Sequence, residues 1–457
     1  MPMIRSARLT NMRQRMPLLK KLFWLYFLLL FFEGALRKWV LPQLSVPLLL
    51  VRDPVALLII WEAYRTHKWP RQWSSVIGIL AAGLLALCFI QLVAGETSWL
   101  VAMYGLRSYL LPFPVAFIMG ENLDHDDLRK FGLCLLWLLL PLTALEVAQY
   151  RAAPSSILNK GATLGSTQLA YSGGHVRASA TFSYVTGPTT YLPLAAAFIF
   201  YGIADPRFAK RWLIYAASVA LVVAIPVTGS RTLLVLLAAI LACVASAAMF
   251  GVSQLGSALK VVFALMIVGL LVSQLPVVSE STRTFQIRLS EASGSEGGTE
   301  ATISSRVTGP VVRAIESSFS GDHWFGTGIG LGSNAAATLL TGKQQFLAGE
   351  GGFERILFEF GPIFGFAFII FQVMLAVMIT GKALSRVREH QPLAWFLVPS
   401  LIPLVALSTL EQPTLQGFAV IVMGFSLAAL KRVTVPNELA HTVNPQSVQS
   451  YRRIRAY

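Results

Sequence analysis

Apolar segments of similar length alternate with short polar segments along most of the 457-residue chain. Each apolar segment is close to the roughly 20 residues that a helix needs to cross a membrane. We place twelve of them at 21–40, 45–63, 74–94, 99–119, 131–150, 183–202, 212–227, 231–250, 258–276, 355–380, 393–410 and 413–430. The pattern predicts an all-α fold, a polytopic transmembrane helical bundle of about 12 spans.

The composition supports a membrane environment. Hydrophobic residues make up 55% of the chain and charged residues only 13%, whereas soluble domains carry about a quarter charged residues. The three cysteines, Cys88, Cys134 and Cys243, lie inside apolar segments without metal-ligand spacing, so we interpret them as buried hydrophobic side chains. The basic N-terminus precedes an apolar stretch with no small-residue cleavage site, which favours an uncleaved first span over a signal peptide.

The basic residues predict the orientation of the bundle. The formal charge of +15 comes mainly from short segments between spans rather than from a polar domain, which argues against nucleic-acid binding. If the spans alternate, these segments fall on one side, and the positive-inside rule makes that side the cytoplasm. The segments are the N-terminal arm, 65–71, 129–130, 207–211, 382–388 and the tail from 431. Both termini are then expected in the cytoplasm.

Two long polar stretches, 151–182 and 277–352, are expected on the other side of the membrane. The second begins with a Ser- and Gly-rich segment typical of a flexible loop and continues with helically spaced apolar residues. Long loops are usually functional or disordered. We therefore divide the chain into a membrane domain, 1–430, and a basic cytoplasmic tail, 431–457, with 277–352 as a large extracytoplasmic loop between the ninth and tenth spans.

Several cations lie inside spans or on the predicted outer side, against the positive-inside trend. They are Arg37, Lys38, Arg52, Arg107, Arg177, Arg231, Arg306 and Arg313. An arginine in hydrocarbon costs at least about 2.5–3.5 kcal/mol, so it needs a partner or a function. One explanation is internal pairing, because Asp53 follows Arg52 and because Glu33 or Glu146 can neutralise others. These cations outnumber the nearby acids, however, and a guanidinium group binds two phosphate oxygens in a bidentate manner. A lipid-linked phosphate is therefore favoured as the ligand.

Five segments carry a resemblance to a known family. They are FFEGALRKWVLP at 31–42, YGLRSYLLPFP at 104–114, RASATFSYVTGPTTYL at 177–192, TGSRTLLVLLAAI at 228–240, and ISSRVTGPVVRAI, WFGTGIGLGSN and GEGGFERILFEFGPIFG in order across 303–365. Their order, with the long loop before the last three spans, resembles the bacterial O-antigen ligase and O-antigen polymerase superfamily, in its exopolysaccharide polymerase branch. The resemblance implies a GT-C-like helical fold in the bacterial inner membrane.

The family resemblance also implies an activity. A metal-independent membrane glycosyltransferase would pass a glycan from an undecaprenyl-diphosphate-linked donor to a lipid- or glycan-linked acceptor, with no cofactor, in O-antigen or exopolysaccharide assembly. The family arginines that hold the diphosphate match Arg231, in T-G-S-R, and Arg306, at the helical entry of the large loop. A family histidine usually stands nine residues before the glutamate that matches Glu359, but this chain has Glu350 there.

Glycosyl transfer from a diphosphate needs charge stabilisation on the leaving group and a base for the acceptor hydroxyl. We expect Arg231 and Arg306 on the diphosphate and Glu350 as the base. The other substrate-binding candidates are Arg52, Arg107, Arg177 and Arg313. A single carboxylate suffices for direct displacement with inversion.

Other interpretations of the loop residues stay open. Glu350 can be a solvated loop residue, and Glu354 or Glu359 can pair with Arg355 at the head of a span. His323 can be a base or an interface residue. The glycines of GTGIGLG resemble a phosphate loop, but they lack the flanking strand and helix of a nucleotide fold, so tight chain turns are favoured.

The main alternative function is a transporter or flippase for a lipid-linked or anionic solute. Such proteins also carry charges in their spans, but their sites typically lie near the midplane between repeated halves. The sequence has no such repeat, and its charges lie toward one face beside a large loop. These features favour the enzyme. Ligase and polymerase are not distinguished, because both need the same diphosphate site.

Overall fold

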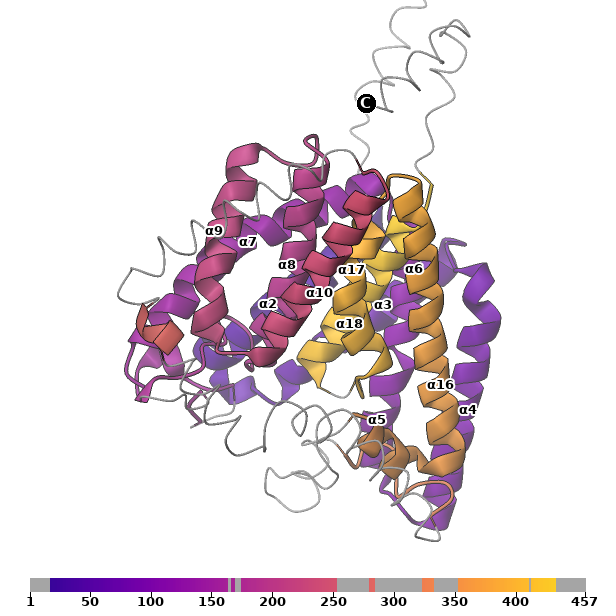
Figure 1. Ribbon diagram of the computed structural model, residues 1–457. Coiled ribbons are helices and arrows are strands. Elements are labelled where there is room, and N and C mark those ends of the chain that lie inside the picture. The colour runs from indigo at the N-terminus through magenta and orange to yellow at the C-terminus, as the bar shows by residue number, and fades with distance from the viewer. Residues whose placement is uncertain are drawn as a thin grey trace, which may run out of the picture.

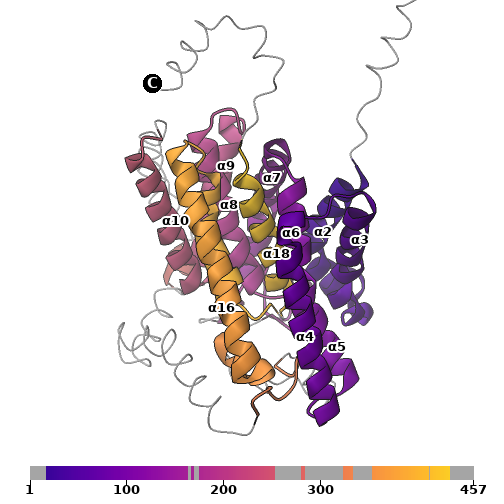
Figure 2. The same cartoon turned by 90° about the vertical axis from the view of Figure 1, so that its right-hand side faces the viewer.

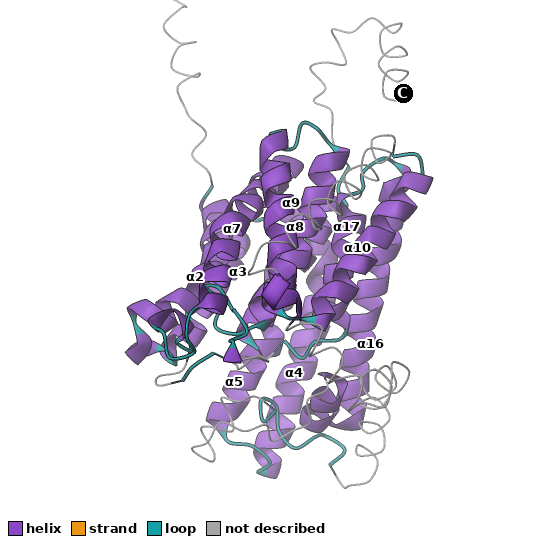
Figure 3. Ribbon diagram, turned by 60° about the vertical axis from the view of Figure 1, so that its left-hand side comes forward, coloured by secondary structure: helices purple, strands orange, loops and turns teal. Residues whose placement is uncertain are grey.

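The computed structural model describes residues 17–162, 166–168, 174–252, 279–283, 323–332, 352–410 and 412–432. Within these ranges the regular secondary structure is helical, and the β-structure is limited to one isolated bridge between Lys160 and Thr167. Figures 1 and 3 show the helices side by side in a single bundle. The all-α prediction is therefore confirmed for the described part of the chain.

Most neighbouring helices in the described ranges are joined by short connections. In chain order they are α2 (Leu18–Ala35), η1 (Leu36–Val40), η2 (Pro42–Leu44), η3 (Pro47–Leu50), α3 (Arg52–Arg65), η4 (Arg71–Trp73), α4 (Ser74–Ala94), α5 (Trp99–Leu110), α6 (Pro112–Asn122), α7 (His125–Arg151), η5 (Ile157–Asn159), α8 (Thr186–Ala204), α9 (Arg211–Thr228), α10 (Arg231–Met249), α16 (Gly352–Arg388), α17 (Leu393–Leu401), η9 (Ile402–Ala406) and α18 (Pro413–Ala429). The η1 and η9 elements are π-helices, and the other η elements are 3₁₀-helices. The exceptions to the short connections lie between α7 and α8 and between α10 and α16.

Eleven of the twelve predicted spans overlap helices in whole or in part, and the remaining one, 258–276, lies outside the described residues, so the number of twelve spans stays a prediction. In the described part of the chain, six helices are long and apolar enough to cross a membrane: Arg71–Ala94, Trp99–Asn122, His125–Arg151, Arg211–Thr228, Arg231–Met249 and Gly352–Arg388. Other predicted spans are shorter or interrupted. The segment 45–63 yields an α-helix only from Arg52 onward, because Pro47 and the turns before it break the helical run.

Contacts at one end of the bundle bring the start and the end of the described chain together. Lys20 pairs with Asp124 and Asp127 at the start of α7, and Lys431 donates to the carbonyl of Leu123 after α6. Most of the short basic segments meet at this end, which we call the basic end. It is the upper end in Figure 1. Because α2 begins and α3 ends at the basic end, the end of α2 and the start of α3 lie at the opposite end of the bundle.

The centre of the bundle is α18, which packs against α2, α6, α7, α8 and α17. Almost all of its residues are buried, and Phe418 and Phe425 join a cluster of aromatic rings with Phe27 and Phe31. The peripheral helices differ, because α4 and α10 expose many apolar side chains. An apolar outer surface of this kind is expected where lipid replaces water as the solvent.

Candidate functional site

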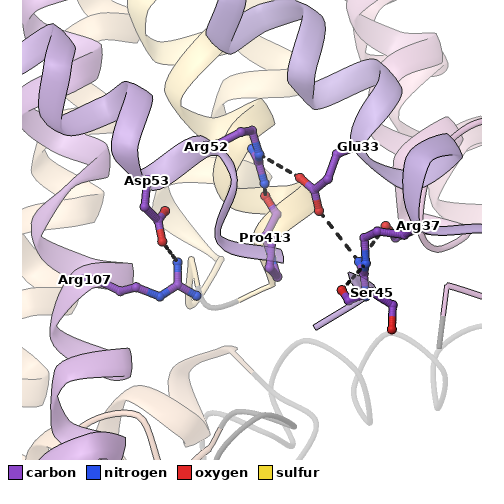
Figure 4. A network of polar contacts seen from close by, with 8 residues as sticks. Glu33, Arg37, Ser45, Arg52, Asp53, Arg107 and Pro413 are labelled. Atoms are coloured by element: carbon purple, nitrogen blue, oxygen red, sulfur yellow. Dashed lines mark hydrogen bonds and ion pairs between the residues drawn. The ribbon is translucent and has the colours of Figure 1, made fainter. Parts of the chain in front are cut away.

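Five charged residues from three helices and a π-helical turn meet at the end opposite the basic end (Figure 4). We call them the arginine cluster: Glu33 in α2, Arg37 in η1, Arg52 and Asp53 at the start of α3, and Arg107 in α5. Antiparallel packing of α2 against α3 places the end of one helix beside the start of the other. The cluster therefore joins residues that are far apart in the sequence.

Arg52 is the most deeply buried of the three guanidinium groups in the arginine cluster, with 3% of its side chain exposed. Its Nε donates to Glu33 Oε2 at 3.0 Å, and its Nη2 donates to the carbonyl of Pro413 at the start of α18. The guanidinium also lies 5.7 Å from the centre of the Tyr26 ring. A Cβ at Gly417 would overlap Arg52 Nη1, so the arginine fits only because residue 417 has no side chain.

The two flanking arginines have different environments. Arg37 donates from Nε to the Ser45 carbonyl at 2.7 Å and from Nη1 to Ser183 Oγ at 2.8 Å, and it lies 3.7 Å from Glu33. Arg107 donates to Asp53 Oδ2 at 2.7 Å and is 14% exposed. Arg107 therefore forms the accessible edge of the cluster.

Internal pairing is confirmed for Arg52 and Arg107, but the expected partner of Arg52 was wrong. Arg52 pairs with Glu33, whereas Asp53 pairs with Arg107. Adjacent residues of a helix point to different faces, so Arg52 and Asp53 meet different neighbours. Glu146 is buried in α7, and its Oε2 has no hydrogen-bond partner among the described residues.

The pairs do not satisfy all the arginine donors. Arg52 Nη1 and Arg107 Nε and Nη2 are buried and make no hydrogen bond within the described residues. Leaving a buried donor without an acceptor costs about 1–3 kcal/mol, and more when the group is charged. Unused guanidinium donors at the edge of a buried cluster are suited to bind the oxygens of an anion.

Sequence reasoning noted Lys38 but did not include it in the site. Lys38 is 1% exposed and donates from Nζ to Ser179 Oγ and to the Ala180 carbonyl. Those acceptors are neutral, so Lys38 adds a cation beside the cluster. The signal was its position at the end of an apolar span, next to Arg37. Both residues lie in η1, and π-helical turns occur frequently at functional sites.

An amide network orders the stretch that was expected to be a polar outer loop. Gln149 donates to the carbonyls of Leu158 and Ala180 and accepts from the Ala180 N–H. Gln168 accepts from the Ser179 N–H. These contacts hold Ala180 at φ 47°, a strained conformation for a residue with a side chain. The acceptors of Lys38 are therefore fixed by the loop itself.

Arg177, a predicted substrate-binding residue, lies two positions before Ser179 in this ordered segment and is half-buried. Just before it, the His175 ring stacks on Tyr150 at 4.2 Å, and its Nε2 lies 3.1 Å from Glu280 Oε1. The structure thus connects the Arg177 segment to Lys38 through Ser179. It does not place the Arg177 side chain against the arginine cluster.

The GTGIGLG segment makes tight turns, as favoured above. Gly326, Gly328 and Gly330 all have positive φ, and Gly330 packs directly on Gly105 of α5. Gln91 of α4 holds the segment through the Phe325 carbonyl and the Ile329 N–H. These contacts attach residues 323–332 to α4 and α5.

Glu359, in α16, is fully buried and has a structural role. It accepts from Tyr109 Oη at 3.0 Å and from the Gly332 N–H at 2.6 Å. These two hydrogen bonds, rather than a helix-start ion pair, hold its carboxylate. His323 is exposed and lies 3.5 Å from Glu96.

Of the three residues predicted to carry the reaction, Arg231, Arg306 and Glu350, the structure describes one. Arg231 is the first residue of α10, after Gly229 with φ 58° and Ser230, which caps the helix. It is half-buried and lies at the same end as the arginine cluster. Arg306 and Glu350 lie outside the described residues, and so does Arg313. Of the predicted residues, the structure therefore brings together Arg52 and Arg107.

Comparison of the chain with family models, with curated proteins and with solved structures found no match. The functional argument consequently depends on the residues and their geometry.

Proposed function

We propose that this protein is a membrane glycan ligase or polymerase of the O-antigen ligase type. It transfers a glycan from an undecaprenyl-diphosphate-linked donor to a lipid- or glycan-linked acceptor in surface polysaccharide assembly. The arginine cluster binds the diphosphate of the donor, and Arg231 and Arg306 complete the binding site.

One observation carries the proposal. The arginine cluster together with Lys38 contains four cations, Arg37, Lys38, Arg52 and Arg107, but only two carboxylates, Glu33 and Asp53. Buried guanidinium donors remain without an acceptor on Arg52 and Arg107. A doubly charged diphosphate would balance this excess and accept those hydrogen bonds. Apolar surroundings strengthen such interactions relative to water.

The proposed chemistry follows from the charge distribution. Departure of the diphosphate puts negative charge on the leaving group, and fixed guanidinium groups stabilise that charge without reorganising. Glu350 takes the proton from the acceptor hydroxyl, which attacks the sugar carbon as the bond to the diphosphate oxygen breaks. This single displacement inverts the anomeric configuration.

The proposal includes a topology. Twelve spans, with both termini in the cytoplasm of a bacterial inner membrane, put the arginine cluster on the extracytoplasmic face. Two observations support it: the short basic segments gather at one end of the bundle, and the cluster lies at the other. A lipid-linked donor would then reach the cluster from the outer leaflet.

A reconstituted assay tests the activity. Purified protein in liposomes is given a lipid-linked donor and acceptor, and both are followed by mass spectrometry. Loss of donor together with growth of a glycan supports transfer. Movement of intact lipid without a change in its glycan contradicts transfer and supports the flippase alternative.

The double variant Arg107→Gln/Asp53→Asn tests the site. It removes one cation and one carboxylate together, so the excess charge stays the same while the unused guanidinium donors of Arg107 disappear. We expect transfer to fall by about a hundredfold, the usual effect of losing one donor to a developing charge. The matched control is Arg151→Gln, an exposed arginine at the same end. Equal activity in both variants contradicts the site.

The variants Arg231→Ala and Arg306→Ala test the two arginines assigned by resemblance. Each is expected to abolish transfer while leaving the protein inserted in the membrane at its normal level. Retained activity in both would refute their assignment to the diphosphate.

A further inference from the structure

A cavity of about 400 Å³ lies at the basic end, opposite the arginine cluster. It is formed where the ends of α6, α16 and α18 meet the start of α4. Figure 2 shows α16, α6 and α4 toward the viewer, with α18 behind them. Its volume is within the range of roughly 300–1,000 Å³ that small-molecule sites occupy. The proposed transfer reaction does not use this cavity.

The cavity wall has an apolar part and a charged part, in which four basic side chains outnumber two carboxylates, Glu121 and Glu389. The basic side chains are Lys382 and Arg386 from α16 and Lys431 and Arg432 after α18. The apolar part contains Leu427, Leu430 and Trp73, and the Trp73 ring stacks on Phe117 at 4.3 Å. A ligand with an anionic head and an apolar body matches such a wall.

Two of the four cations are already used by the protein. Lys431 donates to the carbonyls of Glu121 and Leu123, where it satisfies the end of α6. Arg386 pairs with Glu389 one helical turn further on. Glu121 accepts from Gln72 at 2.7 Å.

The other two cations have weaker attachments or none within the described residues. Arg432 lies 3.9 Å from Glu389, which it shares with Arg386, and is 79% exposed. Lys382 is exposed at the cavity, and neither a hydrogen bond nor an ion pair holds it within the described chain. Lys382 and Arg432 are therefore the charges that can turn to a ligand.

We propose that this cavity binds the phosphate headgroup of an anionic membrane lipid. Three of the helices that end at the cavity, Arg71–Ala94, Trp99–Asn122 and Gly352–Arg388, are long enough to cross a membrane, which places the cavity at the depth of lipid headgroups and favours a lipid over a free phosphate. Basic pockets between helices on the cytoplasmic side are known to hold such headgroups. The proposal is independent of the transfer reaction, because the two sites are at opposite ends of the bundle.

Native mass spectrometry of the purified full-length protein tests the proposal. The protein in detergent is titrated with phosphatidylglycerol or with phosphatidylcholine, and bound lipid is counted. Phosphatidylglycerol is expected to bind more tightly. In Lys382→Gln/Arg432→Gln its affinity should fall roughly thirtyfold, because each basic residue near an anionic surface contributes about fivefold.

The control is Arg207→Gln/Lys210→Gln, which removes two exposed cations between α8 and α9 at the same end. It should change the affinity less than twofold. Equal binding of the two lipids, or an equal loss in both double variants, overturns the proposal. A second arm adds inorganic phosphate or glycerol 3-phosphate at millimolar concentration. Displacement of the lipid by either compound supports a phosphate site but overturns the lipid as its natural source.

Discussion

The ion pairs of Arg52 and Arg107 at the arginine cluster join different helices, whereas two ion pairs at the basic end, Glu62–Arg65 and Arg386–Glu389, join residues three positions apart in the chain. Arg52 pairs with Glu33 across two helices and is 3% exposed. Arg386 pairs with Glu389 within one turn, and Glu389 is 43% exposed. Exposed pairs of the second kind contribute about 0–1 kcal/mol, whereas breaking a buried pair strands a charge. The position of an arginine thus tells more about its role than the total charge does.

The largest expected difference between the two ends comes from removing Arg52. Arg52→Ala leaves the buried Glu33 carboxylate with only Arg37 nearby, at 3.7 Å. We expect a loss of about 3–5 kcal/mol of stability. Arg386→Ala, the matched variant at the basic end, should cost less than about 1 kcal/mol, because the Glu389 carboxylate that it leaves behind is exposed to water. Thermal unfolding of both proteins in detergent measures the difference, and equal melting temperatures would contradict it.

The second prediction concerns the space that Arg52 occupies. In Gly417→Ala the new methyl group overlaps the guanidinium, which must move from Glu33 and Pro413. The cost of such overpacking is typically about 1–3 kcal/mol. Gly78→Ala in α4 is the control, since a Cβ there meets nothing within 4 Å. Its melting temperature should stay unchanged or rise, and a drop equal to that of Gly417→Ala would refute the steric explanation.

A third variant separates stability from function at Lys38. Lys38→Met removes a buried ammonium whose described acceptors are neutral, and apolar replacement of buried charge is often neutral or stabilising. We expect a melting temperature equal to or above that of the wild type, with glycan transfer reduced at least tenfold. Transfer at the wild-type rate would contradict a role of Lys38 in donor binding, and a clear fall in melting temperature would contradict the expected neutral effect on stability.

The smallest effect is expected at Asp124 on the basic end. Partial burial raises the pKa of its carboxyl, but hydrogen bonds from Lys20 and from Asp127 outweigh this and lower the pKa to about 2. An unfolded aspartate has a pKa of about 3.9. The stabilisation is therefore complete above about pH 3.9 and is lost as the pH falls toward 2.

The variant Asp124→Asn isolates this contribution, because asparagine also caps helices. Its melting temperature should lie below that of the wild type at pH 6, and the gap should close between pH 4 and pH 2.5. Because Asp124 is 60% exposed, we expect a small gap. A gap that does not change with pH would contradict the ionic explanation.

The sequence predicted the helices well where local signals agree. The span 74–94 matches α4 (Ser74–Ala94), because an apolar run ends at Gly95, which adopts the left-handed conformation that ends helices. The prediction was poorer at 45–63, where Pro47 begins a 3₁₀ turn in an apolar run before α3. Hydropathy counts residues and does not detect such breaks.

The site was predictable only in part. Position within apolar segments marked Arg52 and Arg107 as unusual, and the structure places both in one cluster. Their partners depend on helix packing, which adjacent sequence does not encode. Glu359 illustrates the same limit, because its hydrogen bonds come from Tyr109 and Gly332, which are distant in the chain.

The attachment of Lys38 has a consequence for the order of synthesis. Its acceptors, Ser179 and Ala180, are 141 and 142 residues further along the chain, and Ser183, an acceptor of Arg37, is 146 residues beyond that arginine. Glu33, in contrast, is made just before Arg37 and enters the membrane with it. During biogenesis this glutamate is the first countercharge available to the nascent end of α2. When synthesis has reached the end of α6, the acceptors Ser179, Ala180 and Ser183 have not yet been made. Lys38 can therefore bind its native partners only after α7 has been synthesised.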